Sequence, residues 1–188
     1  MKKVKNLGTK TIETERLILR RFNMEDAEAM YKNWASDEEV TKFLTWPPHS
    51  SVEVTKVVLK DWIDNYKEDD FYQWAITLKE YGDEPIGSIT VVEKNEKVNM
   101  VHIGYCIGKR WWNTGVTSEA LKALINYFFK EVGINRVESR HDPNNPNSGK
   151  VMMKCGMRYE GTVRQADINN QGICDYSMYG ILAEEYLE

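Results

Sequence analysis

The residues most suited to chemistry lie in a short turn that leads directly into a helix. Residues 98–107 alternate as a strand does, and residues 116–132 repeat apolar positions at the spacing of an amphipathic helix. The turn between them contains Asn113, Thr114 and Gly115. Because the first N–H groups of a helix lack partners and its dipole is positive there, such a turn favours a phosphate group. An ordinary strand-to-helix connection explains the same residues equally well.

Other reactive motifs are absent from the sequence. It contains no G-x-S-x-G nucleophile elbow, no P-loop, no G-x-G-x-x-G and no zinc-binding H-E-x-x-H. The three cysteines are dispersed without a C-x-x-C pair and the three histidines are far apart, so no metal site is predicted. His102 lies in a predicted strand and is more simply interpreted as a core or edge residue than as a catalyst.

Composition limits the class of protein. The chain has 188 residues, 41% of them hydrophobic, and a formal net charge of −4, which gives no general attraction to nucleic acid or anionic lipid. No apolar run approaches the roughly 20 residues needed to cross a bilayer, and the lysines near the N-terminus precede no signal-peptide core. We expect a soluble cytoplasmic protein, monomer or homodimer, that binds neither nucleic acid nor membrane.

The elements around the turn predict one α/β domain over residues 1–188. If the strands before and after the long helix share a sheet, the helical crossover makes them parallel. Asn23, Ser50 with Glu53, and Asn145 with Pro146 carry the signals of helix N-termini. The predicted strands are residues 12–22, 71–79, 85–92, 98–107, 134–140 and two on either side of residues 169–172, and the predicted helices begin near residues 23, 50, 116 and 147.

Four segments together resemble one protein family. Residues 110–120, RWWNTGVTSEA, resemble the acyl-CoA-binding loop W-G-K-G-Y-A-T-E-A of the Gcn5-related N-acetyltransferases, in the branch similar to ribosomal-protein N-terminal acetyltransferases. Residues 142–157, DPNNPNSGKVMMKCGM, resemble the family segment N-x-x-S-x-x-V-x-x-K-x-G-F/M. TERLILR at residues 14–20 and PIGSI at residues 85–89 also look like that branch. The segments follow the family's order and cover nearly the whole chain.

The resemblance implies a fold and a cofactor site. The fold would be α/β of the α+β type, a mixed and mostly antiparallel sheet flanked by helices, with a parallel strand pair across the site for acetyl-CoA. The pantetheine arm would pair with the strand end at Cys106, Ile107 and Gly108, where a backbone N–H would face the developing oxyanion, and Asn145 would hold the arm from the other side. The pyrophosphate would bind the backbone N–H groups of Asn113, Thr114, Gly115, Val116, Thr117 and Ser118.

Two departures from the family pattern bear on cofactor affinity. Asn113 replaces the first glycine of the loop, and Thr117 replaces a small residue at its end. Thr117 would either narrow the approach of the pyrophosphate or donate a hydrogen bond to it.

The resemblance also implies residues for the chemistry, which is direct attack of an amine on acetyl-CoA. Ser148 aligns with a serine near the sulfur and would supply a proton or hydrogen bond to the departing thiolate. A first-turn serine that bonds to the helix backbone is the alternative. Asp167 aligns with the carboxylate that resembles the general base, although the family commonly has the longer Glu, and a simple place near a hairpin turn explains it equally well.

The acceptor is the least determined part of the prediction. The resemblance points to residues 37–51, with Phe43, Trp46 and His49, and to the hairpin near Asn169 as its walls. We expect a protein N-terminal α-amine. The alternatives are a small amine, such as an antibiotic, polyamine or amino acid, and a non-catalytic module that binds acyl-CoA.

Overall fold

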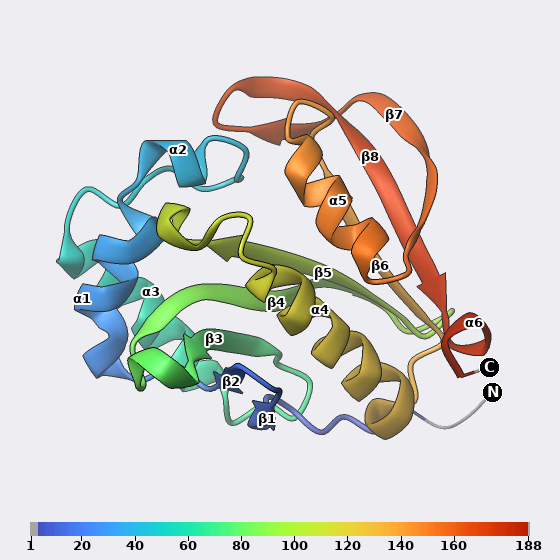
Figure 1. Ribbon diagram of the computed structural model, residues 1–188, viewed down its shortest axis with the longest axis horizontal. Helices are drawn as coiled ribbons and strands as arrows, with labels where there is room; N and C mark the ends of the chain where they lie inside the picture. Colours follow the sequence, from blue (N-terminus) through green and yellow to red (C-terminus); the bar gives the residue numbers. More distant parts are fainter. Residues whose placement is uncertain (1–3, 188) are drawn as a thin grey trace.

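Eight strands form a single sheet in the computed structural model, which describes residues 4–187 (Figure 1). Their order across the sheet is β1-β2-β3-β4-β5-β6-β8-β7. Neighbouring strands run antiparallel except β5 and β6, which are parallel and joined through the α4 crossover. The strands are β1 Ile12–Glu13, β2 Leu17–Arg20, β3 Gln73–Leu78, β4 Pro85–Asn95, β5 Met100–Ile107, β6 Arg136–His141, β7 Arg158–Asn169 and β8 Gly172–Leu182.

Helices cover both faces of the sheet. The helix α4 lies along one face, while α1 and α3 lie against the other (Figure 1). The helical elements are a 3₁₀ turn Met24–Asp26, α1 Ala27–Met30, a π turn Tyr31–Ala35, α2 Glu38–Thr41, α3 Val52–Asn65, 3₁₀ turns Lys79–Tyr81 and Lys109–Trp111, α4 Val116–Tyr127, a π turn Phe128–Val132, α5 Pro146–Lys154 and α6 Ala183–Leu187.

Two layers of apolar side chains follow from this arrangement. Trp74 and Ile76 of β3 join the core beneath α4, whereas Ala75 joins the core shared with α1 and α3. Because both faces are covered, every residue of β3 is buried, including the polar Gln73 and Thr77. Successive side chains of β3 therefore pack alternately into two different cores, one on each face of the sheet.

Several predicted boundaries are confirmed and others are wrong. Asn23 caps its helix by accepting a hydrogen bond from the backbone N–H of Glu25. The predicted capping box at Ser50 is wrong, because α3 starts at Val52 and its N-cap, Ser51, makes no side-chain capping bond.

The first predicted strand, residues 12–22, is divided into β1 and β2. A tight turn separates them, in which the N–H of Thr14 donates to the carbonyl of Leu17 at 3.0 Å. The predicted loop, residues 37–51, contains the short helix α2, whose N-cap Asp37 accepts from the N–H of Glu39 at 2.8 Å. At the other end of the chain the predicted hairpin forms, with Asn169 opposite Gly172.

Candidate active site

The turn before α4 has the backbone that an anion site needs. Asn113 and Gly115 both have positive φ, +62° and +83°, and Gly115 is the N-cap of α4 without a side-chain capping bond. Asn is one of the few residues that tolerate the left-handed conformation, so it can replace a glycine at position 113. No side chain at the N-cap position therefore occupies the first N–H groups of α4.

An ion pair fixes this turn to the edge of the sheet. Glu119 in the first turn of α4 accepts from the Nε of Arg16 at 2.7 Å and from the Thr14 hydroxyl at 2.6 Å. Arg16 also donates from Nη1 to the carbonyl of Thr114 at 3.1 Å. Burial of Glu119 favours its neutral form, but the hydrogen bonds from Thr14 and Arg16 outweigh burial and lower its pKa.

The predicted pyrophosphate residues differ in what their side chains can offer. Val116 is 1% exposed and belongs to the core beneath α4, so it can contribute only its backbone. Thr117 and Ser118 are also buried. The Thr117 hydroxyl makes no hydrogen bond with another residue in the described part of the chain, 4–187.

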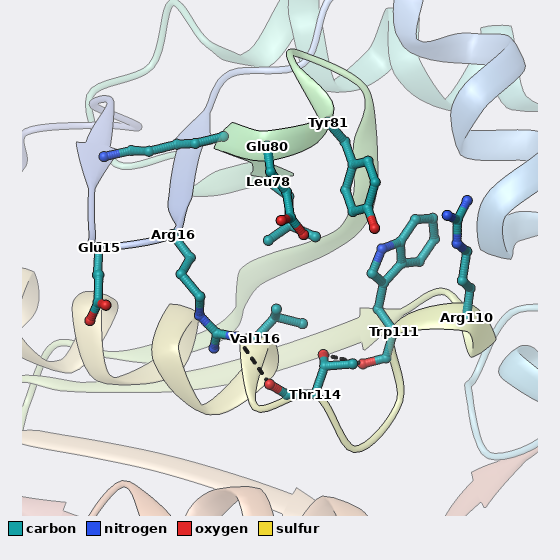
Figure 2. Close-up of a pocket in the computed structure, with 10 residues that line it drawn as sticks. Glu15, Arg16, Leu78, Glu80, Tyr81, Arg110, Trp111, Thr114 and Val116 are labelled. Atoms are coloured by element: carbon teal, nitrogen blue, oxygen red, sulfur yellow. Dashed lines mark hydrogen bonds between the residues drawn. The ribbon is translucent and has the colours of Figure 1, made fainter.

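A cavity of about 340 Å³ lies beside the turn, on the side of β2 and β3 (Figure 2). It shares Thr114 and Val116 with the predicted pyrophosphate site, and its lining includes none of the other predicted cofactor or catalytic residues. Trp111 forms part of its wall, and the indole Nε1 is buried without a hydrogen-bond partner among residues 4–187. The cavity is therefore a separate hollow behind the turn.

The parallel strands β5 and β6 diverge after a short contact. They pair only from Met100 opposite Arg136 to His102 opposite Glu138. Beyond that point the Ser139 hydroxyl donates to the carbonyl of Ile103 at 2.7 Å. The rest of β5 has an edge that β6 does not cover.

The register of β5 identifies which N–H groups face that edge. In an antiparallel pair, successive residues direct their N–H and C=O groups alternately toward and away from the partner. Gly108 donates its N–H to the carbonyl of Ile86 on β4, so the N–H of Cys106 also faces β4, whereas the N–H groups of Tyr105 and Ile107 face the open edge. Of Cys106, Ile107 and Gly108, it is thus Ile107 that directs its N–H toward the gap between β5 and β6.

The neighbours of Ile107 are occupied in other ways. Its carbonyl accepts from the Nε1 of Trp112 at 3.0 Å. The Cys106 thiol lies 3.3 Å from the Ser88 hydroxyl, and burial raises its pKa. A Cβ at Gly108 would stand 2.5 Å from the carbonyl oxygen of Asn33, so a larger residue does not fit there.

Ser148 lies on the opposite side of the divergence, in the first turn of α5. Asn145 is the N-cap of α5 and Pro146 follows it, as predicted, but the Asn145 side chain makes no capping bond. The Ser148 hydroxyl is 3.0 Å from the Oη of Tyr105. It is thus bonded to β5, and the predicted alternative, a serine bonded to its own helix backbone, is not what the structure has. The sequence did not single out Tyr105, because the alternating pattern of residues 98–107 groups it with residues expected in the core.

Asp167 lies on β7, opposite Cys174 and just after a bulge. Its carboxylate forms an ion pair with the Nε of Arg140 at 2.9 Å, and the Arg140 guanidinium lies over the Tyr176 ring, 5.0 Å from its centroid. One carboxylate oxygen also accepts from the backbone N–H of Ile168. The structure places no described contact between Asp167 and Ser148.

The two segments expected to wall the acceptor site are joined to each other. The side-chain amide of Asn170, at the tip of the β7–β8 hairpin, donates to the carbonyls of Thr41 and Trp46, both at 2.8 Å. Its backbone N–H donates to the carbonyl of Leu44 at 3.1 Å. The hairpin tip therefore reaches over to the segment around α2 (Figure 1).

His102 and His49 have structural partners. His102 is 4% exposed with Nδ1 3.4 Å from Glu138, which confirms the interpretation as a core residue. His49 lies 2.8 Å from the Thr55 hydroxyl, and burial lowers its pKa. Among residues 4–187, no cluster of three or more His, Cys, Asp or Glu side chains is arranged to hold a metal, and no helix is long and apolar enough to span a membrane.

The chain thus combines a helix N-terminus without a side-chain cap and a parallel strand pair that diverges, an arrangement that suits an anionic ligand. Residues 16–158 match the acetyltransferase (GNAT) domain family. The chain is 32% identical over 176 residues to an uncharacterized N-acetyltransferase, p20, of Bacillus licheniformis, covering 94% of this chain and 98% of that protein. The chain belongs to the GNAT family and is an N-acetyltransferase.

Other relatives agree with this assignment. The structure superposes on a GNAT-family acetyltransferase of Bacillus anthracis with a TM-score of 0.81 and 28% identity, covering 94% of this chain and 100% of that one. A [ribosomal protein uS5]-alanine N-acetyltransferase of Escherichia coli is 35% identical over 60 residues, 32% of this chain and 31% of that protein. The ribosomal L7/L12 acetyltransferase RimL, solved with coenzyme A, shares the fold at a TM-score of 0.82 and 20% identity, covering 94% of this chain and 99% of that one.

Proposed function

We propose that the protein transfers an acetyl group from acetyl-CoA to the α-amine of a protein N-terminus. The observation that carries the proposal is the geometry of one path: the free N–H of Ile107 at the open edge of β5, followed by the turn from Asn113 to Gly115 and the uncapped start of α4. A pantetheine arm along this edge would bring its pyrophosphate to the helix N-terminus.

The binding residues follow from this path. The N–H groups of residues 113–118 would hold the pyrophosphate, each favourable helix-end interaction contributing about 0.3–1 kcal/mol. The Asn145 side chain, which is free of a capping role, would hold the arm from the α5 side. The N–H of Ile107 would donate to the oxyanion, a contact typically worth about 3–4 kcal/mol.

The reaction proceeds by direct attack. The amine nitrogen bonds to the thioester carbon, the C–S bond breaks, and the electron pair leaves on sulfur. Ser148 would donate to that sulfur. The proton that the amine loses would pass to Asp167, directly or through water, with Arg140 orienting the carboxylate. The shorter Asp makes the water-mediated route the simpler one.

The acceptor class follows from protonation. At pH 7 an α-amine with a pKa near 7.7–8.0 is roughly 10–20% neutral, whereas a lysine near 10.4 is below about 0.1%. General-base assistance typically raises the reaction rate by about 10²–10⁴-fold. The Asp167 carboxylate already forms an ion pair with Arg140, so we expect it to give only modest assistance, and an α-amine needs no more than that. Free Cys106, Cys155 and Cys174 agree with the reducing cytoplasm.

Binding and turnover test the proposal separately. Acetyl-CoA at 100 times its Kd should raise the free energy of unfolding by about 2.7 kcal/mol. Thiol release with an amine-bearing peptide should fall sharply in Ser148→Ala. An unshifted melting temperature at millimolar acetyl-CoA would refute cofactor use, and an unchanged pH profile of kcat/KM in Asp167→Asn would refute the assigned base.

A further inference from the structure

A tyrosine on β5 lies against Ser148, the proposed hydrogen-bond donor to the sulfur. Tyr105 Oη is 3.0 Å from the Oγ of Ser148 and 3.0 Å from the backbone carbonyl oxygen of Ser148. The contact joins β5 to α5 across the divergence of β5 and β6. The two residues are 43 positions apart in the sequence, so the fold alone brings them together.

The number of protons limits what this pair can do. A phenol carries one proton, a serine hydroxyl carries one, and a carbonyl only accepts. If Tyr105 donates to the carbonyl, the contact between the hydroxyls requires Ser148 to donate to Tyr105. If Tyr105 donates to Ser148 Oγ instead, the Ser148 proton is directed to a third group.

The surroundings keep Tyr105 a donor. Burial raises the pKa of its phenol, although the hydrogen bond with Ser148 opposes the shift. A neutral phenol at physiological pH gives no proton to a thiolate but donates a hydrogen bond well. Its effect on the reaction must then pass through Ser148.

We infer that Tyr105 is a positioning residue, which donates to Ser148 Oγ and so directs the Ser148 proton at the sulfur of the departing thiolate. The inference rests on the proposed function. As the C–S bond breaks and the electron pair leaves on sulfur, the Ser148 hydroxyl keeps its proton and donates a hydrogen bond to the thiolate, and the hydrogen bond from Tyr105 strengthens Ser148 as a donor. The proton lost by the amine passes to Asp167, as proposed above, so the step leaves the thiolate on coenzyme A and the proton on the carboxylate.

Tyr105→Phe removes only the hydroxyl and tests this role. We expect kcat to fall roughly tenfold or more, since acid–base contributions are about 10²–10⁴-fold, while the KM for acetyl-CoA stays unchanged. Tyr179→Phe is the matched control, because Tyr179 is a buried tyrosine of β8, which pairs with β6, and its ring packs against His141. It should retain wild-type kcat.

The double variant gives the sharper result. Groups that act as a unit are strongly non-additive. In a Ser148→Ala background, Tyr105→Phe should therefore cause no further fall in kcat. Additive losses, or a rise in the KM for acetyl-CoA that matches the fall in kcat, would mean that Tyr105 merely anchors α5 and would overturn the inference.

A more conservative replacement of Tyr105 and the activity of the wild-type protein provide further tests. Incorporation of 3-fluorotyrosine in place of Tyr105 keeps the ring and hydroxyl, and should retain kcat even if the phenylalanine variant folds poorly. Loss of kcat with this conservative replacement would overturn the role. A wild-type chain that binds acetyl-CoA but acetylates no amine would refute the proposed function, whereas an active wild type with a fully active Tyr105→Phe variant refutes the inference alone.

Discussion

Arg16, in the turn just before β2, and Glu119, in the first turn of α4, form an ion pair of 2.7 Å that also reaches the cofactor turn, because Arg16 donates to the carbonyl of Thr114. The pair connects the edge of the sheet to the start of the helix. It is therefore the contact most able to keep the N–H groups of the turn in place.

Glu119→Gln should weaken both folding and cofactor binding. The substitution removes the charge that accepts hydrogen bonds from Thr14 and Arg16, and charged hydrogen bonds of this kind contribute about 1.5–3 kcal/mol. Urea unfolding and acetyl-CoA titration measure the two effects. Glu131→Gln, an exposed carboxylate at the other end of the same helical segment, is the control and should leave both unchanged.

Gly115→Ala should disturb the turn through backbone conformation. The added Cβ would meet only the Nη2 of Arg16 at an ordinary 3.5 Å, but the φ of +83° costs a non-glycine residue about 1–2 kcal/mol. We expect a lower melting temperature and weaker binding of acetyl-CoA. Asn113→Gly, which suits the φ of +62° equally well, should bind like the wild type; equal losses in both variants would contradict this explanation.

Thr117 offers a test of how the departure from the family loop affects the cofactor. Its hydroxyl is free of other described partners, so we expect it to donate to a phosphate oxygen. Thr117→Val keeps the volume and removes the donor, and should raise the Kd of acetyl-CoA about fivefold or more, as expected for a hydrogen bond of about 1 kcal/mol. If Thr117→Ala instead binds more tightly than the wild type, the methyl group obstructs the pyrophosphate and the assignment is wrong.

The contacts between the tip of the β7–β8 hairpin and the segment around α2 should affect binding of the peptide acceptor more than binding of acetyl-CoA. Asn170→Ala removes both side-chain hydrogen bonds to the segment around α2. We expect a higher KM for the peptide acceptor, an unchanged KM for acetyl-CoA and faster hydrogen exchange in residues 41–46. Gln171→Ala, at the next position of the turn, is the control, and a selective rise in the KM for acetyl-CoA would contradict this role.

A carboxylate at the junction of β5 and β6 predicts how stability depends on pH. The hydrogen bond with His102 and the contact with Arg136 lower the pKa of Glu138, although burial opposes them. A carboxylate whose folded pKa lies below the unfolded value of about 4.3 stabilises the fold at higher pH, and this contribution disappears as the pH falls through the folded pKa. Urea unfolding of Glu138→Gln should show a shallower loss of stability below about pH 5 than the wild type, and identical curves would contradict the assignment.

Local sequence patterns predicted the features of the fold that depend on residues close together in the sequence. The start of α4 after Gly115, the parallel pairing of β5 with β6, and the turn between Asn169 and Gly172 all follow from short stretches of sequence. The division of residues 12–22 did not, because a two-residue strand gives too short an alternation.

Contacts between distant segments could not be predicted in this way. Asn170 and Thr41 are 129 positions apart, and Tyr105 and Ser148 are 43 apart. Whether such side chains meet depends on which face of each strand they occupy and on the register of the sheet. The choice of Ile107 over Gly108 as the free N–H donor likewise required the pairing of β5 with β4.

The most direct measurement is a competition for acetyl groups, followed by mass spectrometry. Acetyl-CoA and the wild-type protein are incubated with one peptide that has a free N-terminus and an internal lysine, its N-terminally blocked counterpart, and a small polyamine. The proposal predicts acetylation at the α-amine of the first peptide, lost in Ser148→Ala. Acetylation of the polyamine or of the lysine in preference to the free N-terminus would contradict it.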